Sequence, residues 1–291
     1  SEKIRNKFKN FLQADLNIDK TPNKFFEYKK PFQDFCVAVN FDLEPCGFLK
    51  MHGYITENIS NAFCGNVQIA SQTGLTEIID AKIVLSGQLN TEERFIFGQE
   101  DIKLSDTSES FSEKLGGYSY CLLENKKITV ATDYFGLDSL FYYTDGNVFL
   151  FSNRYQLLLR ILSECKLKLT VNEEYISNSL FVLNHVYNDY LMDDNCLFNE
   201  IKVLPFAKKA YIKADGVVFE NTEVYDVLNA EKELTVEEYN ALVYQARDEI
   251  IHNIKVVLDS KHFDHFSMDL TGGLDSRLSF AAATNIEGEN K

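Results

Sequence analysis

The chain has 291 residues, of which 45% are apolar and 25% are charged, values typical of a globular protein and not of a disordered or fibrous one. No stretch approaches 18 uncharged apolar residues and none has the pattern of a secretion signal, so we expect a cytoplasmic protein with no membrane partner. The formal net charge of −15 opposes binding to nucleic acid or to an anionic lipid surface.

The first 30 residues are basic, with eight Lys or Arg against four Asp or Glu. Ile4, Phe8, Phe11 and Leu12 recur at helical spacing, which predicts a solvated amphipathic helix. A docking arm is the alternative.

The cysteines form no CxxC pair, which argues against a zinc site and a disulfide framework. We therefore expect free, buried thiols in a reducing compartment. His262 and His265 would lie on opposite faces of a predicted strand, so we expect them to be structural. The six cysteines are Cys36, Cys46, Cys64, Cys121, Cys165 and Cys196.

The first half of the chain is rich in strand-like segments. Strands are predicted at 35–43, 82–89 and 94–98 from their β-branched and aromatic residues. Residues 116–153 have the pattern of a meander of short strands with polar breaks. The clearest break is Asp145-Gly146-Asn147, which predicts a hairpin.

Two helices and a hairpin are predicted further along the chain. The helices cover 154–165 and 173–183, and the hairpin covers 208–220 with its turn at Asp215-Gly216. We place a domain boundary after this region, which divides the chain into residues 1–230 and 231–291.

The second part begins with a helix signal. Thr235, followed three residues later by Glu238, predicts a capping box ahead of apolar residues at helical spacing. Residues 262–270 then read as a strand, 271–276 as a loop with two adjacent glycines, and the residues after Asp275 or Ser276 as a helix.

That loop has the chemistry of an anion site. Glycines let backbone N–H groups approach a ligand, and a helix N-terminus adds unpaired donors. Thr271 and Ser276 add hydroxyls, and Asp275 could hold a Mg²⁺ ion bound to phosphates. A tight strand-to-helix turn capped by Asp275 and Ser276 explains the same residues, and both readings stay open at this point.

The loop TGGLDS (271–276) resembles the SGGxDS pyrophosphate loop of ATP-pyrophosphatase enzymes. The segment TDYFGLDSLFYY (132–143) resembles the RDxxGxxPLYY segment of the asparagine synthetase glutaminase domain, although Thr132 and Ser139 depart from it. Three more segments resemble that family in the same order: SGQLN (86–90), LGGYSY (115–120) and LFNEIKVLP (197–205). The chain therefore resembles the asparagine synthetase family over about residues 82–284.

This resemblance implies an α+β protein. The expected fold is an N-terminal-nucleophile-type αββα sandwich of antiparallel sheets, followed by the first strand, loop and helix of a doubly wound α/β synthetase domain. The resemblance also implies that ATP and Mg²⁺ are cofactors. The ATP pyrophosphate would bind Thr271, Gly272, Gly273, Asp275 and Ser276, with Mg²⁺ at Asp275.

The glutaminase half departs from the family at each functional position. Residue 1 is Ser1, whereas a class II glutaminase needs an N-terminal Cys. The oxyanion Asn aligns with Ser86, which leaves only the Gly87 backbone and a shorter hydroxyl. The Asp that binds the glutamine amino group aligns with Gly116, and no arginine lies between Ser60 and Ala81 to bind the carboxylate.

A glutaminase-like half without its functional residues resembles β-lactam synthetases and lasso-peptide cyclases, which keep the fold but use an amine that does not come from glutamine. It implies an ATP-dependent amide-forming ligase that activates an unidentified carboxylate as an acyl-adenylate. Because only 15 residues follow Ser276, we expect a missing C-terminal synthetase part, no synthesis by this chain alone, and association with that part or with a second copy. A glutamine-hydrolysing asparagine synthetase, with Cys46-Gly47-Phe48 as a processed start, and a non-enzymatic interaction module are the alternatives.

Overall fold

The computed structural model describes residues 31–61, 65–179, 194–223, 233–263, 266, 271, 273–284 and 286. The chain divides into two units, Ser1–Lys30 and Pro31–Lys291. The first unit, which contains the predicted basic helix, lies outside the described residues. In the part that is described, no helix is long and apolar enough to cross a membrane.

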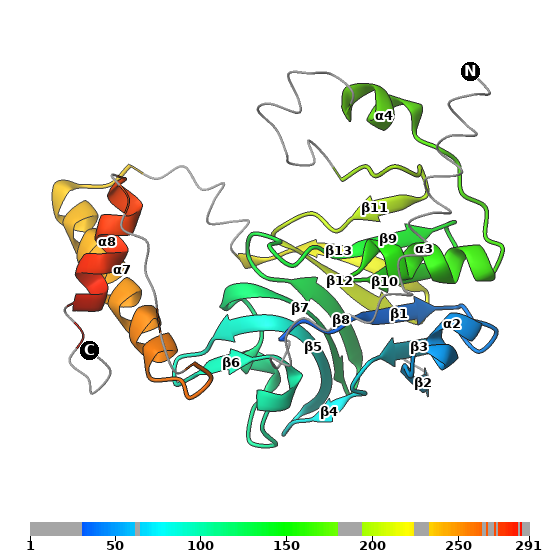
Figure 1. Cartoon of the computed structure of the whole chain (residues 1–291), viewed down its shortest axis with the longest axis horizontal. Helices are drawn as coiled ribbons and strands as arrows, with labels where there is room; N and C mark the ends of the chain where they lie inside the picture. The colour runs from blue at the N-terminus through cyan, green and yellow to red at the C-terminus, as the bar shows by residue number, and fades with distance from the viewer. Residues whose placement is uncertain are drawn as a thin grey trace. The chain divides into compact units, whose positions relative to one another are not determined.

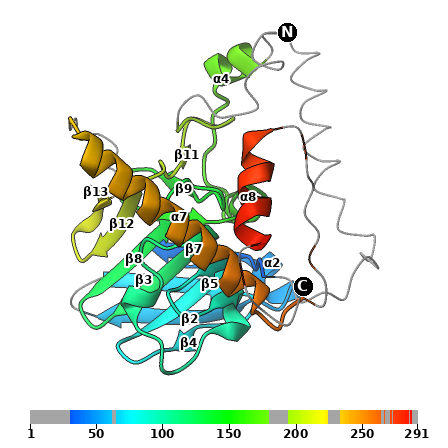
Figure 2. The same ribbon diagram turned by 90° about the vertical axis from the view of Figure 1, so that its left-hand side faces the viewer.

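Two antiparallel sheets make up most of the second unit (Figure 1). Sheet A has the strand order β11-β9-β10-β1-β3-β2, and sheet B has the order β13-β12-β8-β7-β5-β4, with β6 also paired to β5. Figure 2 shows the strands of sheet B side by side. The strands are β1 (Phe35–Val39), β2 (Ile55–Asn61), β3 (Gly65–Ser71), β4 (Thr76–Glu77), β5 (Ala81–Asn90), β6 (Phe95–Phe97), β7 (Leu115–Glu124), β8 (Lys127–Thr132), β9 (Phe141–Thr144), β10 (Phe149–Ser152), β11 (Ile201–Val203), β12 (Lys208–Lys213) and β13 (Gly216–Asn221).

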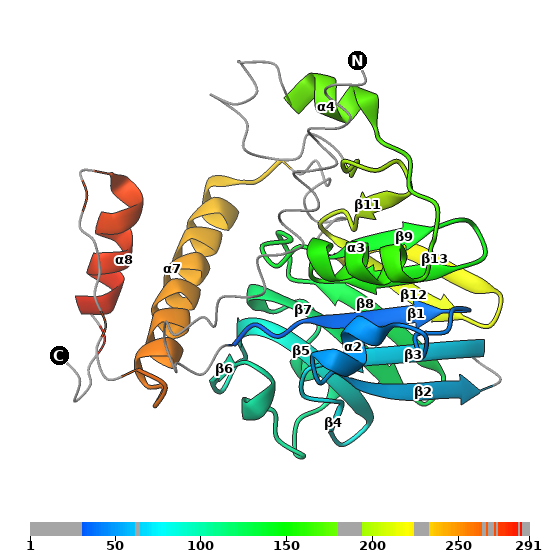
Figure 3. The ribbon, with the colours of Figure 1, turned by 45° about the vertical axis from the view of Figure 1, so that its right-hand side comes forward.

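Helices are few, and α2 and α3 lie against sheet A (Figure 3). Helix α3 buries Leu157, Leu158, Ile161 and Leu162, which recur on one face at helical spacing. The helical elements are α2 (Gly47–Met51), α3 (Tyr155–Glu164), α4 (Glu173–Ser179), α7 (Val236–Leu258), α8 (Leu274–Thr284) and the 3₁₀ turns η2 (Gln99–Asp101) and η3 (Ser108–Ser110).

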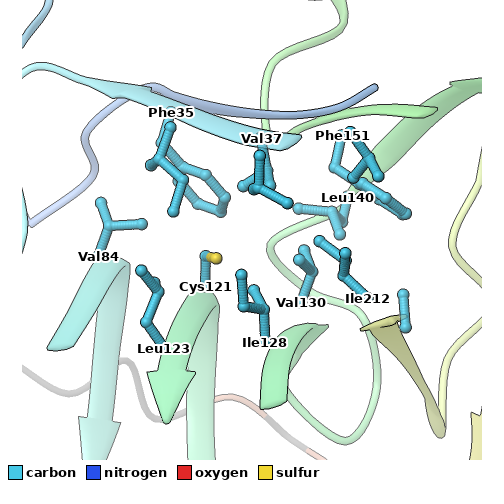
Figure 4. Close-up of a cluster of buried hydrophobic side chains, with 14 of the residues drawn as sticks. Phe35, Val37, Val84, Cys121, Leu123, Ile128, Val130, Leu140, Phe151 and Ile212 are labelled. Atoms are coloured by element: carbon cyan, nitrogen blue, oxygen red, sulfur yellow. The ribbon is translucent and has the colours of Figure 1, made fainter. Parts of the chain in front are cut away.

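The main core lies between the two sheets (Figure 4). Strand β1 contributes Phe35, which lies opposite Cys121 of β7, and Val37, which lies opposite Val130 of β8. The alternate residues of β1 are also buried, because α2 and α3 cover the other face of its sheet. Burial on both faces explains why β1 is almost continuously apolar.

A second buried cluster lies on the outer face of sheet B. Here Ile96, Ile102 and Phe111 pack against Leu85 of β5 and Tyr120 of β7. These covering residues belong to β6 and to the loop that carries η2 and η3. Among the described residues no α-helix contributes to this cluster. The two antiparallel sheets agree with the expected sandwich, and its second helical layer stays a prediction. The covering segment is polar and lacks apolar residues at helical spacing, so it folds as short turns.

The predicted meander over 116–153 is divided between the sheets. Strands β7 and β8 pair in sheet B, whereas β9 and β10 pair in sheet A, so residues 133–140 pass from one sheet to the other. The hairpin at 145–147 is confirmed. The later hairpin is confirmed too, although Lys213 pairs with Gly216 and the loop is therefore Ala214-Asp215.

Most other predicted elements are found. The strand at 35–43 ends at Val39, the helix at 154–165 and the strands at 82–89 and 94–98 are present, and the capping box of Thr235 and Glu238 is formed. Helix α4 ends at Ser179, and the rest of the helix predicted to 183 lies outside the described residues. So does the domain boundary at 230/231, which stays a prediction.

The strand predicted at 262–270 is not seen in the residues that are described there. His262 lies in a turn, and Phe263 and Phe266 have no regular secondary structure. His265 and the remaining residues of that segment lie outside the described part. The five described cysteines are free, as predicted, and Cys64 is not among the described residues.

Candidate functional site

The region that the resemblance assigns to the oxyanion hole lies on β5. Ser86 is fully buried, and Gly87 has φ +103°, in a place where a Cβ atom would lie 2.2 Å from the carbonyl oxygen of Gly117. Only glycine fits there. The Gly87 N–H donates to the carbonyl oxygen of Pro31 at 2.8 Å. The backbone donor that glutamine hydrolysis would need is therefore already paired within the chain.

Residues 31–34, which include the Pro31 carbonyl, are held in place by hydrogen bonds to other parts of the chain. The Gln33 Nε2 donates to the Leu85 carbonyl at 2.7 Å and to Gln99 Oε1 at 3.0 Å. Asn153 donates through Nδ2 to the Gln33 carbonyl at 2.8 Å and accepts the Phe35 N–H at 3.0 Å. Residues 31–34 thus run into β1 with their polar groups satisfied by protein, and they include no Cys, Ser or Thr.

The position that aligns with the glutamine-binding Asp has no room for a side chain. A Cβ atom on Gly116 would lie 2.1 Å from the carbonyl oxygen of Gln88 and 2.7 Å from the Cα of Leu89. Residues 89 and 116 are paired between β5 and β7, and the two backbones approach closely here. The lost carboxylate therefore could not be placed on this backbone.

Cys46, the alternative nucleophile, is buried at the N-cap of α2. Its thiol donates to Glu164 Oε2 at 3.4 Å, and burial raises the pKa of Cys46 to about 11. A thiolate is the reactive form, and these surroundings disfavour it. A short helix follows Cys46, so no strand begins at the proposed processing site.

Two buried carboxylates near these strands were not identified as site residues from the sequence. The Asp133 carboxylate accepts backbone N–H groups of Tyr118, Phe135, Leu137 and Asp138 at 2.9–3.3 Å. It therefore fixes the turn after β8 and keeps little capacity to bind a substrate.

Asp138 accepts the Ser119 hydroxyl at 2.6 Å. Burial raises the pKa of Asp138, although the Ser119 hydroxyl and the Arg154 guanidinium oppose that shift. The Arg154 guanidinium also pairs with Asp34 at 2.7 Å. Ser119, Asp138, Arg154 and Asp34 therefore have partners within the protein, whereas the buried Ser86 hydroxyl has none.

The glycine loop brings the predicted hydroxyl groups together. Thr271 Oγ1 and Ser276 Oγ lie 2.9 Å apart, and the Gly273 N–H donates to Thr271 Oγ1 at 3.2 Å. Helix α8 begins at Leu274, one residue before the predicted start, so Asp275 and Ser276 belong to its first turn. The N–H groups of a first turn have no partner within the helix.

The loop is exposed to solvent. Asp275 is exposed beside Ser276, and Arg277 Nε donates to the Gly273 carbonyl at 3.1 Å. Arg277 adds a positive charge that was not predicted, because this residue lies outside the glycine motif. Gly272 lies outside the described residues. Within the described residues no group of three or more His, Cys, Asp or Glu could hold a metal, so Asp275 would have to share an ion with ligand oxygens.

No family model matches the chain, and no curated protein matches it. A similar fold occurs in a glutamine phosphoribosylpyrophosphate (PRPP) amidotransferase from B. subtilis, complexed with ADP and GMP, with 10% identity over 65% of this chain and 49% of that one and a TM-score of 0.38. It also occurs in the allosteric regulatory enzyme of purine biosynthesis, with 10% identity over 65% of this chain and 48% of that one and a TM-score of 0.36. The chain spans about half the length of these proteins. At this identity the similarity concerns the course of the backbone alone.

Proposed function

We propose that this chain is part of an ATP-dependent ligase that activates a carboxylate as an acyl-adenylate and passes the acyl group to an amine, and that its β-sandwich is a scaffold without glutaminase activity. The observation that carries the proposal is the TGGLDS loop before α8. It combines glycine backbone, two adjacent hydroxyls and an exposed carboxylate at a helix N-terminus.

The donor set fits a pyrophosphate. Main-chain N–H groups at the first turn of α8 and the hydroxyls of Thr271 and Ser276 are donors, and phosphate oxygens are acceptors. Gly273 leaves the loop backbone open to a ligand, since it has no side chain. Asp275 offers a hard oxygen ligand of the kind that Mg²⁺ prefers when it bridges phosphates.

Each residue has a distinct role in this proposal. When bound, Mg-ATP supplies the electrophilic α-phosphate and the pyrophosphate leaving group. Gly272, Gly273 and the hydroxyls of Thr271 and Ser276 hold the leaving group, and Asp275 holds the metal ion. Arg277 lies at the same turn and adds positive charge where negative charge develops.

Support for the scaffold role comes from the closed glutaminase region. The Gly87 N–H is paired with Pro31, Gly116 has no room for a side chain, and Cys46 is a buried thiol. Loss of a single oxyanion-hole donor costs about 10²–10³-fold in rate in a serine protease, which uses the same kind of stabilisation. We therefore propose that the amine comes from another source than glutamine.

The apolar side chains on α7 and α8 favour further packing. Tyr239 and Leu242 on α7, and Leu274 and Leu278 on α8, are about half exposed or more. Large apolar surfaces of this kind are normally covered. We propose that the remaining part of a synthetase domain covers them, and self-association of the chain would be the alternative.

Exchange of labelled pyrophosphate into ATP by the full-length protein tests the proposal. With a panel of carboxylates, we expect exchange that depends on one class of carboxylate and on Mg²⁺. Ser276→Ala should lower the exchange rate about 10- to 100-fold, since it removes a hydrogen bond to a charged group. Ser279→Ala makes the same change one turn further along α8 and should leave the rate unchanged.

Two outcomes would overturn the proposal in different ways. Absence of exchange with every carboxylate would favour a non-enzymatic interaction module. Release of ammonia from glutamine by the full-length protein would instead favour a glutamine-hydrolysing synthetase and would contradict the scaffold role.

A further inference from the structure

The described residues that follow α7 contact the β-sandwich through His262 and Phe263. His262, in the turn after α7, has its Nε2 atom 2.7 Å from Asp101 Oδ2 in η2, and both side chains are about four-fifths buried. A distance of 2.7 Å requires a proton on Nε2, which both the imidazolium and one neutral tautomer supply.

Asp101 is held in place by the sandwich itself. Its Oδ2 also accepts the Phe97 N–H at 2.7 Å, and its carbonyl accepts Arg94 Nη1 at 2.7 Å. Arg94 is fixed in turn by Asp106 at 2.6 Å. The carboxylate is therefore positioned by residues of the sandwich, and His262 approaches it from the C-terminal side.

Aromatic rings surround this pair. The His262 ring lies 5.4 Å from the ring of Phe97, and the Phe263 ring meets Phe97 at 5.2 Å with an interplanar angle of 81°. Phe266 continues the contact, with its ring 5.7 Å from that of Phe263. Edge-to-face packing of this kind is favourable beyond simple burial of area.

A polar contact on α7 supports the same junction. Asn90, the last residue of β5, donates through Nδ2 to Asn253 Oδ1 at 3.2 Å. Val256, one turn further along α7, is buried. The end of α7 and the turn after it are thus attached to the sandwich through β5, β6 and η2, and only nine positions separate His262 from Thr271.

We propose that Asp101, His262 and the rings of Phe97 and Phe263 form a joint through which the sandwich holds the segment leading into the glycine loop, so that Asp101 and His262 are positioning residues for the phosphate site. This inference rests on the proposed function. It gives the sandwich a task other than glutamine hydrolysis: it limits the conformations available to the loop before a ligand binds.

Breaking the joint should weaken the apparent affinity of the loop for its ligand. If the joint is broken, the loop is in its competent conformation for a smaller fraction of the time, and the apparent dissociation constant for a ligand rises by the inverse of that fraction. Saturating ligand still selects the competent form. The KM for ATP should therefore rise while kcat changes little.

The first test measures amide hydrogen exchange in the full-length protein without ligand. His262→Phe keeps a ring beside Phe97 but cannot donate to Asp101, and loss of a hydrogen bond to a charged group should speed exchange at residues 271–276 roughly tenfold. His262→Gln keeps a donor and should restore part of the protection. His252→Gln, which changes an exposed histidine on α7, is the matched control and should exchange like the wild type.

The second test measures the KM for ATP in the exchange of pyrophosphate into ATP. We expect a KM raised roughly tenfold in His262→Phe with kcat within about twofold of the wild type. Asp101→Asn should shift KM in the same direction and provides a second variant if His262→Phe folds poorly.

The outcomes separate the joint from the proposed function. The proposed joint would be overturned if His262→Phe and Asp101→Asn had the same hydrogen-exchange rates and the same KM as the His252→Gln control. Faster hydrogen exchange in a protein that neither binds ATP nor exchanges pyrophosphate would support the joint as a structural contact, but it would overturn both the proposed function and the positioning role.

Discussion

Adding a single methyl group at residue 116 tests how closely strands β5 and β7 approach each other. Gly116→Ala places a Cβ atom 2.1 Å from the Gln88 carbonyl oxygen and 2.7 Å from the Leu89 Cα. Both obstacles are backbone atoms of the paired strand, so no side-chain rotation relieves the contact. Strands β5 and β7 must separate locally, or the backbone must leave its φ of +157°.

The expected cost is large for a methyl group. Overpacking in a well-packed region costs about 1–3 kcal/mol, and forcing a strained backbone costs a similar amount, so we expect about 2–6 kcal/mol for Gly116→Ala. This is a substantial part of the roughly 5–15 kcal/mol that stabilises an ordinary domain. Gly116→Asp, which restores the aligned carboxylate, should destabilise the protein at least as much.

Urea denaturation followed by circular dichroism measures this cost. With an m-value of about 3 kcal/mol/M, the midpoint of Gly116→Ala should fall by roughly 0.7–2 M. Gly117→Ala is the matched control, because its Cβ would meet only the Leu137 Cβ, at an ordinary 3.6 Å. We expect its midpoint to stay close to that of the wild type.

Two results would refute this reasoning. Equal midpoints for Gly116→Ala and Gly117→Ala would mean that the strands do not approach as closely as described. A stable Gly116→Asp protein that binds glutamine would mean that residue 116 has room for a side chain and that only the missing carboxylate prevents glutamine binding.

Three further predictions concern buried polar groups. Asp133→Ala should lower the free energy of unfolding by about 3 kcal/mol or more in urea denaturation, because several backbone N–H groups lose a charged acceptor; a loss below 1 kcal/mol would contradict this. Burial raises the pKa of Asp138 above its ordinary 3.8, so its contribution to stability is complete below that pH and is lost as the pH rises through the folded pKa. Asp138→Asn should lack this loss when both proteins are unfolded at a series of pH values, whereas parallel pH profiles would refute it. Half-buried Cys165 should react with a thiol reagent before the buried Cys36 and Cys121, whose pKa values are raised by burial; mass spectrometry of labelled peptides checks this order.

The sequence predicts local structure well where a single residue pattern decides it. The helix at 155–164 follows from apolar residues at helical spacing, the cap of α7 from Thr235 and Glu238, and the hairpin at 145–147 from its Asp-Gly-Asn turn. Each of these signals concerns neighbours in the chain, so the rest of the fold does not alter it.

Contacts between distant segments were not predictable in this way. The pairing of β8 with β12, and not with β9, depends on residues far along the chain, so the single continuous meander was wrong. The pairing of Pro31 with Gly87, and that of Asp101 with His262, likewise join segments without any sequence signal. Alignment pointed to Gly87 and Gly116, but only the backbone geometry explains why neither position has room for a side chain.

A crystal structure of the full-length protein grown with ATP and Mn²⁺ in place of Mg²⁺ would show whether the glycine loop binds the nucleotide phosphates. We expect an anomalous manganese peak beside the Asp275 carboxylate, with phosphate oxygens within hydrogen-bond distance of the Gly273 N–H and the Ser276 hydroxyl. A loop in which Thr271 and Ser276 still bond to each other, with nucleotide and metal bound elsewhere or absent, would contradict it.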